Sequence, residues 1–506
     1  MDEFLSVSRK TYMPELYTAA MQRGFAVLSQ PAGAYIYGLE DGEHDPPQRM
    51  PPLGTPLADL KITFNTVGVV GLFGGEEAIS AMATVHLFKG RRWLGWYNSP
   101  ASYGVAKRFG RLGNSRFWQG VFPGSRDSLA VSLGLDGKQG PRYIGALSGT
   151  MIMPTPYISY LAMKRSREVE AEQTGRVTTP FDVTYLTMRP VSHAVPIPLP
   201  LGRRAFYALF TIFSSVVTCV MCALVYDWFS FSTILIGIIC GGLATSVIGE
   251  GKLDIRTVKR PAPGAPPGHG ILIEEGGVVV IKGEEQDVSI ITKGRFELKT
   301  DSKPVDEEKG GNQPHYHAIG LCCLVLFLQS LLQLLLISQG TFFGQIMFVI
   351  SVSVSWGYNS YLSSLDKEKL QTDILFEALG NPQMLRFRVG TRTMMIVFVC
   401  LLLFHGVECS SPEDARRLRC KMLNECLSND TAVWKRWKDK VVEQLVDVHD
   451  GSDSLLHLED LDNGTLSESE KELLDVLLKD ARAAFEEYFN VRGELPDDSS
   501  HRKKVE

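Results

Sequence analysis

The sequence predicts an α-helical integral membrane protein with two transmembrane hairpins that carries α+β cytosolic domains. Residues 205–226, 228–249 and 318–358 contain no Asp, Glu, Lys, Arg or His. A helix that crosses a bilayer needs about 20 apolar residues, so these blocks are long enough to supply such helices. The 52 basic and 57 acidic residues give a net charge of −5, which is too balanced for a nucleic-acid binder. A purely soluble protein, a coiled coil and a small disulfide scaffold are excluded.

Composition divides the chain into globular, linking and apolar segments. In order, they are an N-terminal cytosolic α+β domain at 1–165, a polar and proline-rich linker at 166–204, a first hairpin at 205–248, a small cytosolic α+β insert at 249–317, a second hairpin at 318–361, a cytosolic basic connector at 362–392, a short apolar segment at 393–407 and a helical tail at 408–506 that is acidic toward its end.

The four membrane helices are expected at 205–226, 228–248, 318–337 and 342–361, with a tight turn inside each pair. Residues 78–88 are expected to form a helix in the N-terminal domain.

Within the insert, 271–273 and 278–281 have the composition of strands. Glu284–Lys293 fits a helix, because acids begin it and Gly294 follows its last basic residue. Arg295–Lys299 is expected to be another strand.

Basic residues near the membrane helices set the expected orientation. Arg203 and Arg204 precede the first helix, Lys252, Arg256, Lys259 and Arg260 follow the second, and Lys367 and Lys369 follow the fourth. The two hairpin turns carry no Lys or Arg. Because Lys and Arg favour the cytoplasmic side, the N-terminal domain and the 249–317 insert are expected in the cytosol. The sequence does not indicate which membrane.

Residues 393–407 leave a fifth membrane span open. The segment is strongly apolar, but 15 residues reach about 22 Å, short of the roughly 30 Å hydrocarbon core. It could span the bilayer if side chains at both of its ends reach toward the membrane surfaces, or it could lie partly embedded in the bilayer. If it spans, the sequons at Asn429 and Asn463 would be glycosylated and Cys420 could pair with Cys426. Basic residues at 416–421 favour a cytosolic tail instead.

Small and polar side chains mark candidate helix-packing positions. Gly237 and Gly241 form a GxxxG pattern, which lets helices approach closely, against the first helix or in a dimer. Gln329 and Gln333 lie four residues apart and share a helix face. They could bond neighbouring helices or line a polar path for a solute. The helices contain no ionisable interior residue, which counts against a coupled transporter.

Residues 78–126 contain no Asp or Glu and eight basic residues, interleaved with aromatic ones. Such residues suit an anionic membrane surface, a nucleic acid, or a core of aromatics with solvated charges around it. The tether to a membrane favours the lipid surface over nucleic acid, which is not expected to be a partner. The candidate membrane-surface patch comprises Lys89, Arg91, Arg92, Trp93, Trp96, Lys107, Arg108, Arg111, Arg116 and Trp118.

The tail is expected to end in an amphipathic helix. Ser467 and Glu470 form a capping box, and Leu474, Leu477, Leu478, Ala481, Phe485 and Tyr488 then share one helical face. Residues 441–506 carry 7 basic and 18 acidic groups, so docking of this tail on the basic block is a natural intramolecular contact.

Several stretches resemble a known group of proteins: GRRWLGWYNSPASY at 90–103, the run at 109–134, VVVIKGEEQDVSIITKGRFEL at 278–298 and SWGYNSYLSSLDKEKLQ at 355–371. They are similar to uncharacterised multi-pass membrane proteins of mushroom-forming fungi, over residues 20–490. The resemblance implies a multi-pass membrane protein and carries no functional residues. In that group the segment matching 393–407 is shorter or more polar, which argues against a fifth span.

No catalytic, cofactor or metal-binding pattern is present in the sequence. The favoured interpretation is a non-enzymatic multi-pass membrane protein whose cytosolic domains bind the membrane surface or a partner. The alternatives are an oligomeric channel or uncoupled carrier built from the two hairpins, and a membrane-bound enzyme with an unrecognised site. Polar residues that converge on one cavity between the helices would favour the channel or carrier.

Overall fold

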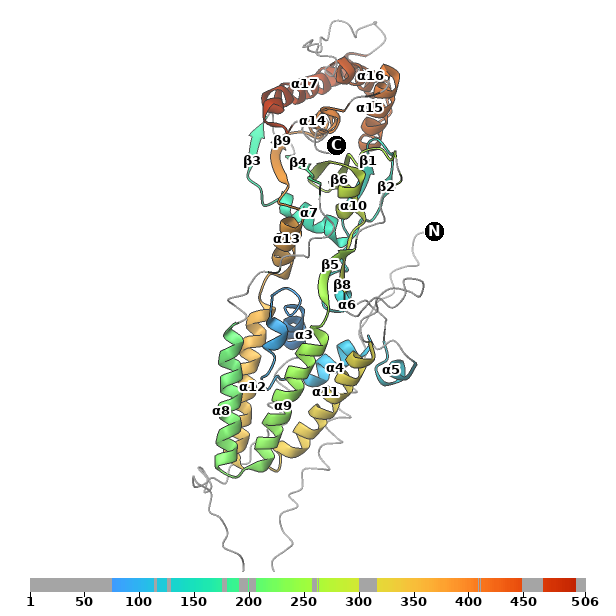
Figure 1. The fold of residues 1–506 in the computed structure, drawn as a ribbon. Helices are drawn as coiled ribbons and strands as arrows, with labels where there is room; N and C mark the ends of the chain where they lie inside the picture. Colours follow the sequence, from blue (N-terminus) through green and yellow to red (C-terminus); the bar gives the residue numbers. More distant parts are fainter. Residues whose placement is uncertain are drawn as a thin grey trace, which may run out of the picture. The chain divides into compact units, whose positions relative to one another are not determined.

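Four apolar helices form two hairpins: α8 (Ala208–Leu224) with α9 (Trp228–Ile248), and α11 (Tyr316–Ile337) with α12 (Phe342–Ser363). By length and composition, Trp228–Ile248 and His317–Ile337 could each cross a membrane. Helix α8 is apolar but has only 17 residues. Helix α9 lies against α8 and α11, and α12 lies against α8 and α9, so the four helices form one bundle (Figure 1).

The structure is a computed structural model and describes the following residues: 75–112, 116–124, 129–174, 180–190, 199, 206–256, 262, 264–299, 316–407, 409, 411–447 and 467–496. The expectations for the first 74 residues, for the prolines of the linker at 191–198, for Arg203 and Arg204, for Lys259 and Arg260 and for the sequon at Asn463 lie outside this set.

Short helices from the N-terminal region pack on the bundle. They are α3 (Gly75–Ala83), the 3-10 turn η1 (Arg91–Trp93), α4 (Ser102–Gly110) and α5 (Arg116–Val121), whose Trp118 lies against Gly320. Helix α6 (Leu129–Ser132) contacts α4 and the strand at 295–299 instead. Helix α3 contacts α12, η1 contacts α9, and α4 contacts α11. The helix expected at 78–88 ends early, at Ala83. Because α3 contacts α12, its region belongs to the bundle instead of to a separate N-terminal domain.

A seven-stranded mixed sheet draws strands from three parts of the chain. Its order is β2 (Met151–Ile152), β1 (Arg142–Gly145), β6 (Gly270–Glu274), β7 (Gly277–Lys282), β4 (Phe181–Thr187), β9 (Gln383–Val389) and β3 (Ala171–Thr174). The pairs β4–β7 and β3–β9 are parallel, and the other pairs are antiparallel. A second, two-stranded sheet pairs β5 (Lys252–Arg256) with β8 (Arg295–Lys299).

This sheet corrects the division into domains. The strands expected at 271–273, 278–281 and 295–299 are present, but β6 and β7 join β1 and β4 instead of forming a domain of their own. All six residues of β7 are buried, and a lone hairpin could not bury both faces of a strand. The presumed linker at 166–204 supplies β3 and β4, and the presumed connector at 362–392 supplies β9.

Helices cover both faces of the sheet. Val279 and Ile281 point to the core formed with α7 (Tyr157–Ser166), α10 (Glu285–Lys293) and α13 (Lys367–Ala378). Helix α10 confirms the helix expected at 284–293. Val278 and Val280, which alternate with them, belong to the opposite core, as the two-residue period of a strand requires.

The apolar segment at 393–407 forms neither a membrane span nor a partly embedded segment. It forms α14 (Arg392–Phe404), in which every residue from Thr393 to Phe404 is buried. Helix α14 contacts β4, β7 and β9 on one side and α15 (Pro412–Cys426), α16 (Ala432–Asp447) and α17 (Glu468–Val491) on the other (Figure 1). A helix that is apolar all round is a core helix when protein surrounds it. The tail therefore lies with the sheet.

The tail helix α17 follows the predicted pattern. The capping box of Ser467 and Glu470 is formed, and all six residues of the predicted apolar face are buried. That face packs on α14 and α16, so the basic block at 78–126 is not what buries it. Cys420 and Cys426 are free thiols, and the side chain of Asn429 is exposed.

Candidate functional site

The segment between η1 and α4 enters the bundle. Its backbone is non-helical from Leu94 to Ala101, and Asn98 reaches Gly237 on α9. Gly237 precedes the end of α9 at Ile248 by 11 residues (248 − 237), which corresponds to about 17 Å along the helix. We call residues 94–101 the re-entrant segment, because this non-helical backbone enters the helix bundle.

Glycines of α9 make room for the re-entrant segment. A methyl group on Gly237 would overlap Asn98 Oδ1, and one on Gly241 would lie 2.7 Å from the carbonyl oxygen of Tyr97. A methyl group on Gly242 would overlap the Trp96 ring. The GxxxG pattern thus allows close approach, as predicted, but the partner is the re-entrant segment and not the first helix or a second copy.

Polar side chains from several helices meet at Asn98. Its backbone N–H donates to Ser215 Oγ at 3.2 Å, and Ser351 Oγ lies 3.3 Å from the same hydroxyl. Gln333 Nε2 donates to Asn98 Oδ1 at 3.2 Å and to the Thr233 carbonyl at 3.1 Å.

Gln329 extends this cluster along α11, because its Nε2 donates to Gln333 Oε1 at 3.3 Å. The prediction that Gln329 and Gln333 share a face is confirmed. Gln333 connects helices, as hydrogen-bonding amides do in apolar surroundings.

Arg91 is a buried cation at the start of the re-entrant segment, with 2% of its surface exposed. Its Nη1 donates to the Leu94 carbonyl at 3.0 Å and its Nη2 to Tyr97 Oη at 3.2 Å. The guanidinium carbon lies 5.4 Å from the centroid of the Tyr358 ring, within the range of a cation–π interaction. Among the residues that the structure describes, no carboxylate pairs with Arg91, and its Nε has no hydrogen-bond partner.

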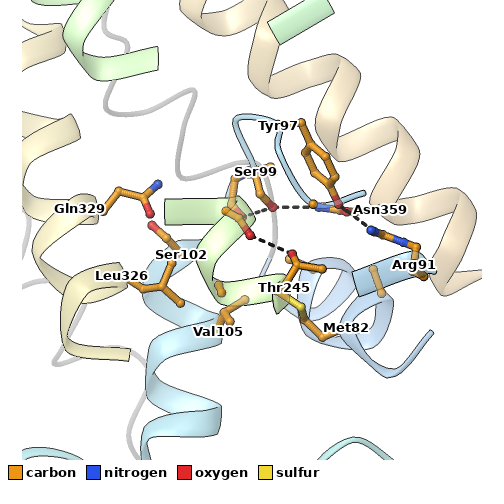
Figure 2. A pocket seen from close by; sticks show the side chains of 16 residues that line it. Met82, Arg91, Tyr97, Ser99, Ser102, Val105, Thr245, Leu326, Gln329 and Asn359 are labelled. Atoms are coloured by element: carbon orange, nitrogen blue, oxygen red, sulfur yellow. Dashed lines mark hydrogen bonds between the residues drawn. The ribbon is translucent and has the colours of Figure 1, made fainter. Parts of the chain in front are cut away.

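Tyr97 links Arg91 to α12 by hydrogen bonds. Tyr97 Oη donates to Asn359 Oδ1 at 2.8 Å, and Asn359 Nδ2 donates to Ser99 Oγ at 3.1 Å (Figure 2). Asn359 is 2% exposed. These bonds fix the re-entrant segment at two points and orient the Arg91 guanidinium.

A cavity of about 20 Å³ lies beside this chain of hydrogen bonds, enough for one water molecule. Its polar lining includes Arg91, Gln329 and Asn359, together with Ser102 of α4 and Thr245 of α9 (Figure 2). Gln329 is 2% exposed, and its Oε1 has no partner among the described residues. Two side chains of the lining thus carry an atom without a partner among the described residues, the donor Arg91 Nε and the acceptor Gln329 Oε1.

The predicted membrane-surface patch does not form one surface. Arg91 and Trp118 are buried, and Trp118 Nε1 donates to His317 Nδ1 of α11 at 3.3 Å. The remaining residues are wholly or partly exposed: Lys89, Trp93, Trp96, Lys107 and Arg116 are exposed, and Arg92, Arg108 and Arg111 are half-buried. The aromatic residues of the patch divide between core and surface: Trp118 of α5 is buried against Gly320 of α11, whereas Trp93 and Trp96 are exposed.

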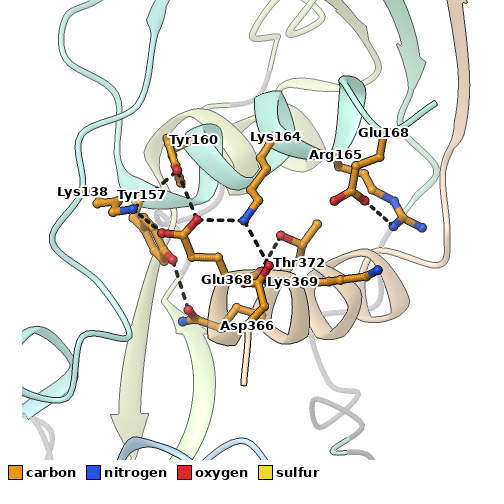
Figure 3. A network of polar contacts seen from close by, with 11 residues as sticks. Lys138, Tyr157, Tyr160, Lys164, Arg165, Glu168, Asp366, Glu368, Lys369 and Thr372 are labelled. Carbon is orange, nitrogen blue, oxygen red and sulfur yellow. Dashed lines mark hydrogen bonds and ion pairs between the residues drawn. The ribbon is translucent and has the colours of Figure 1, made fainter. Parts of the chain in front are cut away.

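A second polar network joins α7 to α13 (Figure 3). Glu368 forms ion pairs with Lys138 and, at 2.9 Å, with Lys164, and it accepts a hydrogen bond from Tyr160 at 3.2 Å. Burial by itself would raise the pKa of Glu368, but the hydrogen bonds and charges of the two lysines outweigh it and lower the pKa to about 2. With this pairing the network holds the two helices together.

Sequence reasoning missed Tyr97, Asn98, Ser99 and Asn359. The available signal was the run from Leu94 to Ala106, which has no charged residue. That run is too short to span a bilayer, but it has the length of a re-entrant segment.

No protein-family model, no curated protein and no solved structure matches this chain.

Proposed function

We propose that the four apolar helices all cross a membrane and that the bundle, with its re-entrant segment, is an uncoupled channel or carrier for a small polar solute. The single observation that carries this proposal is the convergence of polar side chains of α9, α11 and α12 on a cavity beside the re-entrant segment. Helix packing alone would be served by fewer polar groups, because each buried polar atom without a partner costs free energy.

The exposed faces of the helices support a bilayer setting. Large apolar side chains that face outward include Phe210 and Phe213 on α8, Ile239 on α9, Leu328 and Leu335 on α11 and Ile350 on α12. A soluble protein rarely exposes so continuous an apolar surface.

The sheet supports an even number of crossings in each hairpin. Its strands lie before α8, between α9 and α11, and after α12. Since they are paired in one sheet, each hairpin must return the chain to the side it left. Lys252 and Arg256 after α9, and Lys367 and Lys369 after α12, favour the cytosol for that side.

An apolar cluster would narrow the pathway. Cys219 on α8, Ile337 on α11 and Phe348 on α12 are buried together with Ile234 and Val352. Cys219, Ile337 and Phe348 each lie between the hairpin turn of their helix and its polar residue, which is Ser215 on α8, Gln333 on α11 and Ser351 on α12. Apolar constrictions of this kind gate a pathway by dewetting, so this one would lower the permeation rate without abolishing it.

Flux through reconstituted protein tests the proposal. The full chain is placed in liposomes and the permeability to water and to small diols is followed by light scattering after an osmotic step. We expect a rate above that of protein-free liposomes, and a further rise in Phe348→Ala, which removes the largest ring of the constriction. Phe213→Ala, on the exposed face of α8, is the matched control. Rates equal to those of empty liposomes for the wild type and for Phe348→Ala would contradict the proposal.

A second candidate function is docking to an anionic membrane surface, which follows from the residues of the patch that remain exposed. The Arg92 guanidinium lies 4.4 Å from the centroid of the Trp93 ring, and Trp96 is also exposed. Each basic group at an anionic surface adds about 1 kcal/mol of attraction. Co-purifying lipid from a mixed-lipid preparation should be enriched in anionic species, and less so in the variant Arg92→Gln with Lys107→Gln. If the variant co-purifies with the same lipids as the wild type, these residues are solvated groups that do not bind anionic lipid.

A further inference from the structure

We infer that residues 91–112 form a loop that dips into the bilayer itself, descends to mid-membrane depth and returns as α4 to the cytosolic side, where α5 lies. Tyr103 of the loop and Phe117 of α5 then face the acyl chains of the lipid. This inference rests on one part of the proposed function, the crossing of the membrane by the four apolar helices, and it assigns a lipid partner to an N-terminal region that has none.

Contacts with α9 measure the descending limb. Arg92 lies at the end of α9, because a methyl group on Gly249, the residue after the helix, would lie 2.9 Å from Arg92 Cβ. Asn98 lies at Gly237, 11 residues before that end (248 − 237). Since a helix rises by 1.5 Å per residue, the chain descends by about 17 Å between Arg92 and Asn98.

Contacts with α11 measure the ascending limb. The Tyr103 ring, at the start of α4, lies 6.1 Å from the ring of Phe327, which is 11 residues into α11 (327 − 316) and so about 17 Å from its first residue. Trp118 of α5 lies against Gly320, four residues into α11 (320 − 316), about 6 Å from the same end. Helix α4 therefore brings the chain back toward the side from which it entered.

Two tyrosines at the ends of α8 indicate the level of the bilayer. Tyr207 precedes α8 and Tyr226 follows it, and 61% and 42% of their surfaces are exposed. They are 19 residues apart (226 − 207), about 28 Å at the rise of a helix. This separation matches a hydrocarbon core of roughly 30 Å with tyrosines at both of its interfaces.

The same tyrosines place the loop at mid-membrane depth. Ser215 of α8, which accepts a hydrogen bond from the Asn98 N–H, is eight residues after Tyr207 (215 − 207). Asn98 therefore lies about 12 Å below the level of Tyr207. The two estimates of its depth, from α8 and from α9, both put the lowest point of the loop near the middle of the hydrocarbon core.

The exposed side chains of this region suit lipid. Tyr103 is 45% exposed and Phe117 is 64% exposed, and Leu321, which follows Gly320 in α11, is 58% exposed. Residues 91–121 contain no Asp or Glu. Their exposed cations, such as Lys107, have long apolar stems that can lie along the acyl chains while the charged ends reach the headgroups. An anionic cytosolic leaflet attracts such groups.

Photo-crosslinking to lipid tests the inference in the full chain in liposomes. The photoreactive amino acid p-benzoylphenylalanine replaces Tyr103, Phe117, Phe213 or Leu473, one at a time, and mass spectrometry after irradiation measures the lipid adducts. Phe213 on α8 and Leu473 on α17 are the controls, since both are exposed and only the first lies on a helix proposed to cross the membrane. Adducts at Tyr103 and Phe117 should match those at Phe213 and exceed those at Leu473 at least tenfold.

The pattern of adducts separates the inference from the proposal beneath it. Adducts at Phe213, with Tyr103 and Phe117 no higher than Leu473, would overturn the inference and leave the four crossings standing. Adducts at Phe117 but not at Tyr103 would place α5 at the membrane surface and overturn the descent of the loop. No excess over Leu473 at any of the three positions would overturn both the loop and the crossings. Because no flux is measured, the result does not depend on channel activity.

Discussion

Asp227 and Thr341 join the turns of the two helix hairpins. The Asp227 carboxylate accepts a hydrogen bond from the backbone N–H of Thr341 at 2.8 Å and another from its hydroxyl at 2.7 Å. The same carboxylate caps α9 by accepting from the Ser230 N–H at 3.0 Å. Asp227 is 3% exposed, so these three bonds satisfy a charge that is largely withdrawn from solvent.

Replacing Asp227 should therefore loosen both hairpins at once. Hydrogen bonds to a charged group contribute roughly 1.5–3 kcal/mol each, so we expect Asp227→Ala to lower the free energy of unfolding by about 3 kcal/mol or more. Thermal unfolding in detergent measures the change. Glu472→Ala, an exposed acid on α17, should have almost no effect. Equal stability of the two variants would show that the turns do not depend on each other.

Gly237→Ala should displace the re-entrant segment. The added methyl group would overlap Asn98 Oδ1 and lie 2.8 Å from Gln333 Nε2, and overpacking of this kind costs about 1–3 kcal/mol. The control is Gly357→Ala on α12, where no atom lies within 4 Å of the new Cβ. Unfolding temperature and limited proteolysis between α3 and α4 report the difference. If both variants are equally resistant, the segment does not depend on Gly237 for its place.

His86 should make the fold sensitive to mild acid. Burial lowers the pKa of His86 from 6.5 to about 4, against the opposing effect of its hydrogen bond to the Gly251 carbonyl. The unfolded chain then binds a proton that the folded protein does not, so stability is complete above about pH 7 and falls as the pH drops toward 4. The difference between the two pKa values corresponds to about 3 kcal/mol.

The test compares unfolding of the wild type and of His86→Gln at pH 7.5 and pH 5. The variant should be less stable at pH 7.5 and should lose less stability on acidification, because it has no group that titrates in this range. A parallel loss in both proteins would assign the acid sensitivity to other groups.

Glu368 should act in a lower pH range. Its pKa is lowered from 4.5 to about 2, so its contribution is present above about pH 5 and is lost as the pH falls through 4.5 toward 2. Glu368→Gln should weaken the contact of α7 with α13 at pH 7 and remove this part of the acid transition. Hydrogen exchange of α13 measures the contact. Unchanged exchange at pH 7 would mean that the ion pairs of Glu368 with Lys138 and Lys164 do not stabilise the contact of α7 with α13.

Surface labelling tests the proposed orientation. Glu275 is exposed in the turn between β6 and β7, and a cysteine in its place should resist an impermeant thiol reagent in intact cells and react after permeabilisation. Cys409, Cys420 and Cys426, the free cysteines that are not fully buried, are replaced by serine in the background. Ready labelling of intact cells would reverse the proposed topology.

Local sequence patterns predicted the helices well where an apolar composition or a single amphipathic face is enough to indicate a helix. The apolar helices, α10 and α17 were all found, because charge-free blocks, capping residues and helical periodicity are visible within a short window. The positions of Gln329 and Gln333 on one face followed from the same periodicity.

Long-range pairing could not be predicted in this way. Strands β4 and β9 have the alternating pattern of strands, but nothing in either segment indicates that they are neighbours in a sheet. The re-entrant segment was interpreted as part of a surface because its aromatic and basic neighbours suit that reading equally well. Only the packing of Asn98 against Gly237 distinguishes a segment that enters the bundle from a segment at the surface.

The sheet also sets an order of events during synthesis. Strand β9 begins at Gln383 and pairs along the whole of β4, which ends at Thr187. At typical rates of about 5–20 residues per second, the ribosome needs roughly 10–40 s to make the chain between them. During that interval both hairpins are made while one side of β4 has no partner strand. An unpaired strand side readily pairs with another chain. Variants that weaken β9 should therefore reduce the yield of protein by aggregation during synthesis, before the stability of the finished fold comes into play.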